Sequence, residues 1–305
     1  MFPTISGASM QYLDDLNRTQ EQLNQTQAQV TSGKRVEQAS DAPADIPEIL
    51  QLQSNLAQDQ QVQTNLGSAG TEVSAADTAL QSVISLISQA QSLAAEGASS
   101  NVSAATRADL ATSVTGLQAE LVTLSQTQVN GRYIFSGDQD TQPAYQLDPT
   151  QPEGVQQLLT APATRTITDA SGTAIAVALT ASQIFDPQSA GAPASGNTFA
   201  AVNDLLTALQ NNDQAGIATA ANELQSANDY VNQQLTFYGA AENRISDATT
   251  LAQKFQTQMT SDLGALQDTD IPTAAALSQE QLQMQAATSA EASILQMKSI
   301  FYYLA

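Results

Sequence analysis

Residues 268–304 read DTDIPTAAALSQEQLQMQAATSAEASILQMKSIFYYL, and this stretch predicts a long amphipathic helix that begins at Asp270. In its second half, apolar residues recur at alternating steps of three and four. This spacing places them in one stripe along a helix and is typical of a coiled coil. Asp270 can cap the first turn, and Pro272 stands where its missing N–H leaves no hydrogen bond unmade. The predicted stripe consists of Ala287, Ala290, Ile294, Met297, Phe301 and Leu304.

A second stripe of this kind lies near the other end of the chain, in a helix predicted for residues 8–32. Ser32-Gly33 ends that helix, since Gly commonly follows the last helical residue. Antiparallel return predicts that it pairs with the 270–304 helix. Two such helices bury little core by themselves, so we expect both stripes to be surfaces for assembly, the alternative being packing within one domain. The members of the second stripe are Leu13, Leu16, Leu23 and Val30.

Between these ends, apolar periodicity predicts long inner helices over residues 45–96, 103–130 and 214–265. We expect the apolar stripes of the 45–96 and 214–265 helices to form the protein's own core. The stripe of the first inner helix consists of Leu66, Ala69, Val73, Ala76, Leu80, Val83, Ile87 and Ala90.

The segment 132–197 differs from the rest, because it contains most of the prolines and short runs of alternating apolar and polar residues. Such runs predict β-strands. The fold class is therefore predicted to be mainly α, with long antiparallel helices forming a rod-like bundle or coiled coil and a small β-rich domain inserted mid-chain. Strands are predicted at 133–135, 144–147, 165–168, 174–179 and 184–185.

The composition excludes several classes of function. The net charge is −21, which disfavours nucleic acid and anionic membrane surfaces as partners. The chain has no Cys and no His, so it cannot build a Ser–His–Asp or Cys–His arrangement or a thiolate or imidazole metal site. We therefore predict no enzyme activity, no catalytic residue, no cofactor and no metal. The N-terminus lacks the pattern of a cleaved signal peptide, and no stretch is long and apolar enough for a membrane span.

A few charged residues could have a specific binding function. Asp138 and Asp140 could bind a cation, but the spacing of an EF-hand loop is missing. The pair Lys34-Arg35 is interpreted as a counter-charge at a helix end rather than as a docking site.

Several stretches resemble the flagellin superfamily. Residues 31–44, TSGKRVEQASDAPA, are similar to its N-terminal segment, although Ala42 stands where a second acidic residue is usual. Residues 268–271, followed by the Gln-rich helix, resemble its C-terminal segment. The stretches most similar to the hook–filament junction proteins within that superfamily are NGRYIFSG at 130–137, residues 197–210 and the ending 300–304.

The resemblance implies a structural protein outside the cell, in the bacterial flagellum, exported by the flagellar apparatus without a cleaved signal peptide. It implies an adaptor at the hook–filament junction that packs through its terminal helices and transmits torque. The partners implied are a neighbouring hook-associated protein, flagellin, an export chaperone, and other copies of the chain in a ring or helical assembly. Three layers are implied: 1–40 with 267–305 as a terminal coiled coil, 41–139 with 198–266 as a helical rod, and 140–197 as an outer β-rich insertion.

Two other interpretations are open at this point. The chain could be a filament flagellin, or a cytoplasmic coiled-coil binding protein. Finding the protein inside or outside the cell would distinguish the cytoplasmic interpretation from the two flagellar ones.

Overall fold

The computed structural model describes residues 7–160 and 164–302, and the surroundings of the side chains in 14–160 and 164–290. The chain divides into two compact units. One contains the residues up to 58 together with those from 256 on, and the other contains residues 59–255. Two helices, α2 (Ile46–Gly97) and α6 (Gln214–Gln267), contribute to both units.

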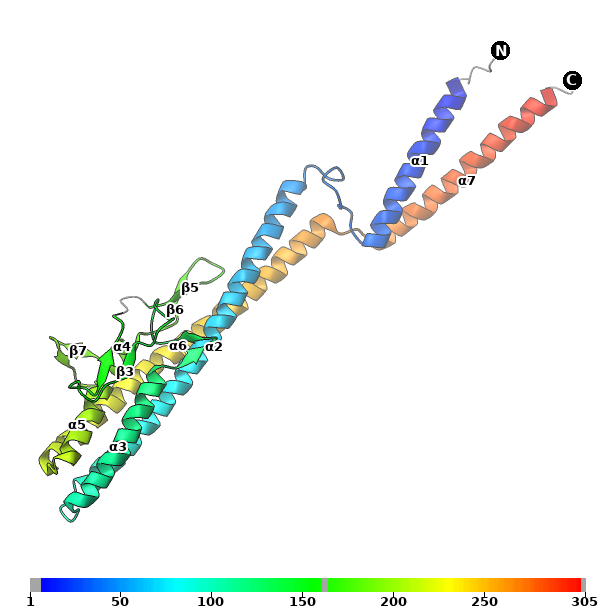
Figure 1. The fold of residues 1–305 in the computed structure, drawn as a ribbon. Coiled ribbons are helices and arrows are strands. Elements are labelled where there is room, and N and C mark those ends of the chain that lie inside the picture. Colours follow the sequence, from blue (N-terminus) through cyan, green and yellow to red (C-terminus); the bar gives the residue numbers. More distant parts are fainter. Residues whose placement is uncertain (1–6, 161–163, 303–305) are drawn as a thin grey trace. The chain divides into compact units, whose positions relative to one another are not determined.

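The first unit is built on the pair formed by α1 (Gly7–Ser32) and α7 (Ile271–Tyr302). These helices lie side by side although they are at opposite ends of the sequence (Figure 1). The pairing is antiparallel, since Gln20 of α1 is hydrogen-bonded to Gln285 of α7 while Lys34 pairs with Asp268. The predicted pairing of the two terminal helices is therefore confirmed.

In the second unit, α2 and α6 run antiparallel. Gln91 donates a hydrogen bond to Gln225 (3.3 Å), and Gly70 packs against Ile245. Two further helices, α3 (Ala104–Ser125) and α5 (Thr198–Gln210), pack against each other beside them. Every member of the predicted stripe of α2 is buried, and Leu80 is completely inaccessible to solvent. The expectation that this stripe forms the protein's own core is confirmed.

The described residues between α3 and α5 form four two-stranded antiparallel hairpins. In the first hairpin, the turn consists of Asn130 and Gly131, and both residues have the positive φ (53° and 76°) that such a turn needs. The pairs are β1 (Gln128–Val129) with β2 (Arg132–Tyr133), β3 (Tyr145–Leu147) with β4 (Val155–Gln157), β5 (Thr166–Thr168) with β6 (Ala174–Ala176), and β7 (Gln188–Ser189) with β8 (Ala192–Pro193).

One predicted strand is wrong, because Ile184 and Phe185 lie in a short helix, α4 (Ala181–Phe185). Thr180 caps that helix: its hydroxyl accepts from the backbone of Gln183, whose side chain accepts from the backbone of Thr180 in return. A two-residue apolar run fits a strand and a helix equally well, and the cap decides between them.

The β-rich segment shares its core with the helices. Phe135 and Phe185 meet edge to face, with ring centroids 5.5 Å apart, and the ring of Tyr145 lies 5.0 Å from that of Phe199 on α5. Tyr238 of α6 joins this aromatic cluster at 6.5 Å from Phe135. The overall class, a mainly α chain with long helices and a small β-rich part mid-chain, is confirmed.

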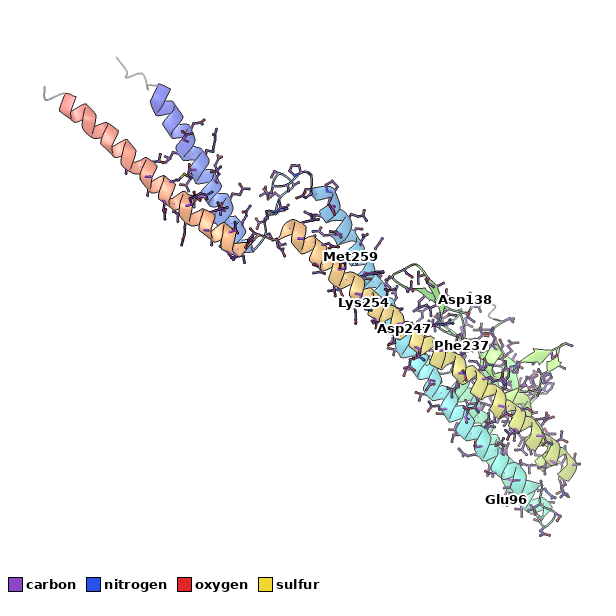
Figure 2. All side chains as sticks on the ribbon, turned by 180° about the vertical axis from the view of Figure 1, so that it is seen from behind. Glu96, Asp138, Phe237, Asp247, Lys254 and Met259 are labelled. Carbon is purple, nitrogen blue, oxygen red and sulfur yellow. The ribbon has the colours of Figure 1, made fainter. Side chains whose placement is uncertain are left out.

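Several charged side chains of the long helices are exposed to solvent. Glu96 on α2 and Asp247 and Lys254 on α6 are exposed, as the view from behind shows (Figure 2). No helix among the described residues combines the length and apolar character that crossing a membrane requires.

Candidate assembly interface

The stripe of α1 faces α7 in the same molecule. Leu23 is 4% exposed, and Leu16 and Val30 are half-buried. Because α7 is the helix that packs against α1, the apolar stripe of α1 is used within the chain, at least in part. Its fourth member, Leu13, has a side chain outside the described residues.

The side of α7 that faces α1 is a different stripe from the predicted one. Ala274 is buried, and four half-buried polar residues follow it at steps of four and three. The sequence analysis missed this stripe because it searched for apolar residues, and most of these side chains are amides or hydroxyls. Their spacing at steps of four and three is the signal that could have revealed the stripe. We call it the inner stripe of α7, and its members are Ala274, Ser278, Gln281, Gln285 and Thr288.

The predicted stripe of α7 lies on the opposite side. At 3.6 residues per turn, Ala287 and Ala290 stand roughly 150° around the helix from the inner stripe. Both residues are exposed. The remaining members of the predicted stripe, Ile294, Met297, Phe301 and Leu304, have side chains outside the described residues. Thus α7 contacts α1 mainly through polar side chains. The described part of its predicted apolar stripe, Ala287 and Ala290, is exposed to solvent.

Large apolar side chains also flank the inner stripe. Leu277 (47% exposed) and Met284 (50%) lie along one flank, and Ile271 (51%) and Leu282 (46%) lie along the other. A helix that presents apolar residues on several sides is normally covered on several sides. The contact with α1 covers one of these sides, so the others form a candidate assembly surface.

The connection between the terminal helices and the long helices is pinned by backbone and side-chain contacts. The guanidinium of Arg35 donates to the Leu266 carbonyl oxygen (2.6 Å) and pairs with Asp45 (3.0 Å). The backbone N–H groups of Arg35 and Val36 both donate to the carbonyl of Gln267 (2.7 and 3.2 Å). The interpretation of the basic pair as a helix-end counter-charge is confirmed for Arg35, which sits at the C-terminal end of α6.

The loop that carries Arg35 is itself ordered by one carboxylate. Asp41 accepts from the backbone N–H groups of Gln38 (2.8 Å) and Glu37 (3.0 Å). These two hydrogen bonds hold the pKa of Asp41 below its usual value, since they favour the charged form. Residues 31–44 therefore build a defined joint rather than an unstructured link.

One of the two candidate cation-binding carboxylates, Asp140, has another role. Asp140 is buried and bound by the guanidinium of Arg132 (2.5 Å), with Arg165 at 3.6 Å. Arg165 pairs in turn with Glu72 of α2 (3.0 Å). Asp140 is thus neutralised by arginine, and the network ties the β-rich segment to α2.

Comparison with known proteins shows which proteins this chain is similar to. Residues 5–140 match the model of the bacterial flagellin N-terminal helical region. Over 208 residues the chain is 28% identical to flagellar hook-associated protein 3 of Escherichia coli (strain K12), a match covering 66% of this chain and 65% of that protein. It is 30% identical over 128 residues to flagellar hook-associated protein 3 of Salmonella typhimurium, covering 42% and 40%. The matches therefore span less than two thirds of the length of either relative.

Solved structures share the fold. A putative flagellar hook-associated protein from Vibrio parahaemolyticus superposes with a TM-score of 0.65 at 19% identity, over 75% of this chain and 100% of that one. FlgL from Bacillus cereus superposes with a TM-score of 0.56 at 16% identity, over 70% and 99%. At these identities the likeness supports the arrangement of helices and the β-rich segment, and nothing finer.

Proposed function

We propose that this chain, a flagellin-like protein that resembles flagellar hook-associated protein 3, is a structural component of the bacterial flagellum that joins hook to filament. Its place in the flagellum is supported by the named relatives. Its mode of action is supported by α7, whose large apolar side chains stay about half exposed while polar side chains contact α1. In this role the chain acts mechanically and catalyses no reaction.

The assembly interface we propose comprises both terminal helices. The outward side of α7 gives the larger contribution, because the described stripe of α1 is already turned toward α7. The leucines and methionine that flank the inner stripe add to the outward surface. The residues originally predicted for this interface are Leu13, Leu16, Leu23, Val30, Ala287, Ala290, Ile294, Met297, Phe301 and Leu304.

The three-layer organisation predicted from the sequence remains part of the proposal. Residues 1–40 and 267–305 form the layer that assembles, and 41–139 with 198–266 form a rod that transmits torque. The segment 140–197 forms an outer layer. The aromatic cluster supports rigid transmission, since Tyr145 of this outer segment packs against Phe199 of the rod.

The partners we propose are a neighbouring hook-associated protein, flagellin, other copies of the chain in a ring or helical assembly, and an export chaperone. Self-association must overcome a net charge of −21. The helix α7 suits this requirement, because its 32 residues include only three charged ones, Glu280, Glu291 and Lys298. Export through the flagellar apparatus would place the protein outside the cell.

Removal of the chain tests this function. Cells that lack it are expected to build hooks that carry no filaments and to release unassembled flagellin into the medium, with attachment restored by re-expression. Electron microscopy of the cells and analysis of the medium provide the readout. Filaments that stay attached would contradict the proposal. Loss of the filaments with no filament protein in the medium would instead indicate that the chain is the filament flagellin.

A further inference from the structure

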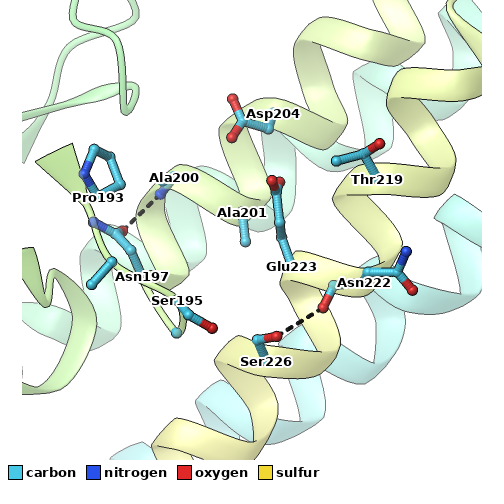
Figure 3. A pocket seen from close by; sticks show the side chains of 12 residues that line it. Pro193, Ser195, Asn197, Ala200, Ala201, Asp204, Thr219, Asn222, Glu223 and Ser226 are labelled. Carbon is cyan, nitrogen blue, oxygen red and sulfur yellow. Dashed lines mark hydrogen bonds between the residues drawn. The ribbon is translucent and has the colours of Figure 1, made fainter. Parts of the chain in front are cut away.

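The helices α5 and α6 leave a hollow between them in the second unit. It measures about 310 Å³, and its lining includes Ala201 and Asp204 of α5 and Thr219 and Glu223 of α6 (Figure 3). The two charged residues of the lining are both carboxylates, which do not attract each other. The contacts that hold α5 against α6 must therefore lie elsewhere, and one set of them is found at the connection 211–213, which joins the two helices.

A buried arginine of α3 links this connection to another one. Arg107 is 6% exposed, and its guanidinium donates hydrogen bonds to three oxygen atoms. Its Nη1 atom donates to Oδ1 of Asn212 (2.6 Å), in the connection between α5 and α6. Its Nε atom donates to the carbonyl of Gly97 (2.8 Å), the last residue of α2, and its Nη2 atom donates to the carbonyl of Ser99 (3.0 Å), in the connection between α2 and α3. One side chain therefore binds both connections at this end of the unit.

The guanidinium of Arg107 has no acidic partner. Among residues 14–160 and 164–290, no carboxylate forms an ion pair with it. Burying an unpaired charge is unfavourable unless hydrogen bonds replace those lost to water. The carbonyls of Gly97 and Ser99 supply such bonds at the C-terminal end of α2, where the helix dipole also favours a positive charge. The chain therefore keeps a buried charge here for its hydrogen bonds, and the planar fork of arginine suits three separate acceptors better than a lysine ammonium does.

Four helices, α2, α3, α5 and α6, meet beside these contacts. A Cβ at Gly97 would lie 2.6 Å from Leu209 of α5 and 3.6 Å from both Leu110 of α3 and Ile217 of α6. All three of these side chains are buried. Gln214, the first residue of α6, adds a hydrogen bond from its side chain to the carbonyl of residue 98 (2.6 Å). The polar contacts of Arg107 thus lie next to an apolar junction of the four helices.

We propose that Arg107 clamps the α2–α3 and α5–α6 connections together, so that neither connection opens without the other. While the clamp is closed, this end of the unit opens as one cooperative body. Without the clamp each connection opens by itself, because the backbone hydrogen bonds within each connection are local turns. Arg107 is thus a positioning residue of the fold, and its role does not depend on the proposed place of the chain in the flagellum.

Hydrogen exchange at the two connections tests the clamp. The backbone N–H of Asp213 reports on the α5–α6 connection and that of Val102 on the α2–α3 connection, since each is hydrogen-bonded to a carbonyl close to it in sequence. In Arg107→Met we expect the protection factors of both amides to fall about tenfold or more, the effect of losing hydrogen bonds to a charged group. Arg244→Met, which removes the same charge from an exposed site on α6, is the matched control and should leave both unchanged. An Arg107→Met variant with the protection factors of this control would overturn the proposal.

A double-mutant cycle distinguishes a clamp from independent contacts. Asn212 has a φ of 52°, so Asn212→Gly removes the acceptor without straining the backbone. Alone, this change should lower the protection of both Asp213 and Val102. Added to Arg107→Met, it should have no further effect, because both changes remove the same interaction. Additive effects of the two changes, or a response to Asn212→Gly confined to Asp213, would contradict the clamp.

A measurement on the unaltered chain keeps the test decisive if Arg107→Met folds poorly. The Nε–H group of Arg107 is buried and hydrogen-bonded, whereas Arg244 is exposed. In nitrogen-15 NMR spectra, the Nε–H of Arg107 should exchange with water at least about tenfold more slowly than that of Arg244. Equal exchange rates for the two groups would show that the guanidinium of Arg107 is not held, and the proposal would fail.

Discussion

Leu80→Asp is expected to unfold the unit formed by residues 59–255. Leu80 has no solvent exposure and lies in the middle of the core that α2 shares with the other helices and the β-rich segment. An unpaired carboxylate at this position would cost several kcal/mol, a large part of the roughly 5–15 kcal/mol that stabilises a folded domain. Far-UV circular dichroism during heating should show a strongly lowered melting temperature or no cooperative transition.

Ser85→Asp is the control for this substitution. Ser85 lies on the same helix but is exposed, so the same charge meets water there and should change the melting temperature little. If Leu80→Asp melts within a few degrees of Ser85→Asp, then the packing of α2 described above is wrong.

The double change Leu277→Asp with Met284→Asp is expected to abolish assembly and leave the monomer intact. Both side chains are about half exposed on one flank of α7 in the single molecule, so charges placed there remain hydrated. In an assembly that covers this flank, each unpaired charge would be buried, at a cost of several kcal/mol per interface. Sedimentation velocity and electron microscopy would measure assembly, and thermal melting would measure the monomer.

The control for the double change places two charges at the same spacing on another helix. Ser85 and Ser92 are seven residues apart on α2, as Leu277 and Met284 are on α7, and both serines are exposed. Ser85→Asp with Ser92→Asp should assemble as the unaltered chain does. A monomer destabilised by the α7 change would show that this flank belongs to the molecule's own core. Normal assembly of the α7 variant would show that the flank is not an interface.

The inner helices could be predicted from the sequence because their buried residues are apolar and regularly spaced. The stripe from Leu66 to Ala90 was predicted residue by residue, and all eight members are buried. The pairing of α1 with α7 was also predictable from the nested order of the helices. In these regions, local periodicity and tertiary packing select the same residues.

Other features could not be predicted from the sequence because they do not depend on a pattern of apolar residues. The inner stripe of α7 consists mainly of Ser, Gln and Thr, which hydropathy does not distinguish from a solvated face. The ion pair between Arg165 and Glu72 joins residues far apart in sequence, so no local pattern predicts it. The role of Arg35 at the end of α6 depends on a contact across 231 positions of sequence.

Immunogold electron microscopy of intact cells, with an antibody against this chain, tests the central claim most directly. If the chain is the adaptor between hook and filament, label should appear at one point, where the filament leaves the hook. Label along the whole filament would identify a filament flagellin instead. Label confined to the cell interior would contradict every flagellar interpretation of the chain.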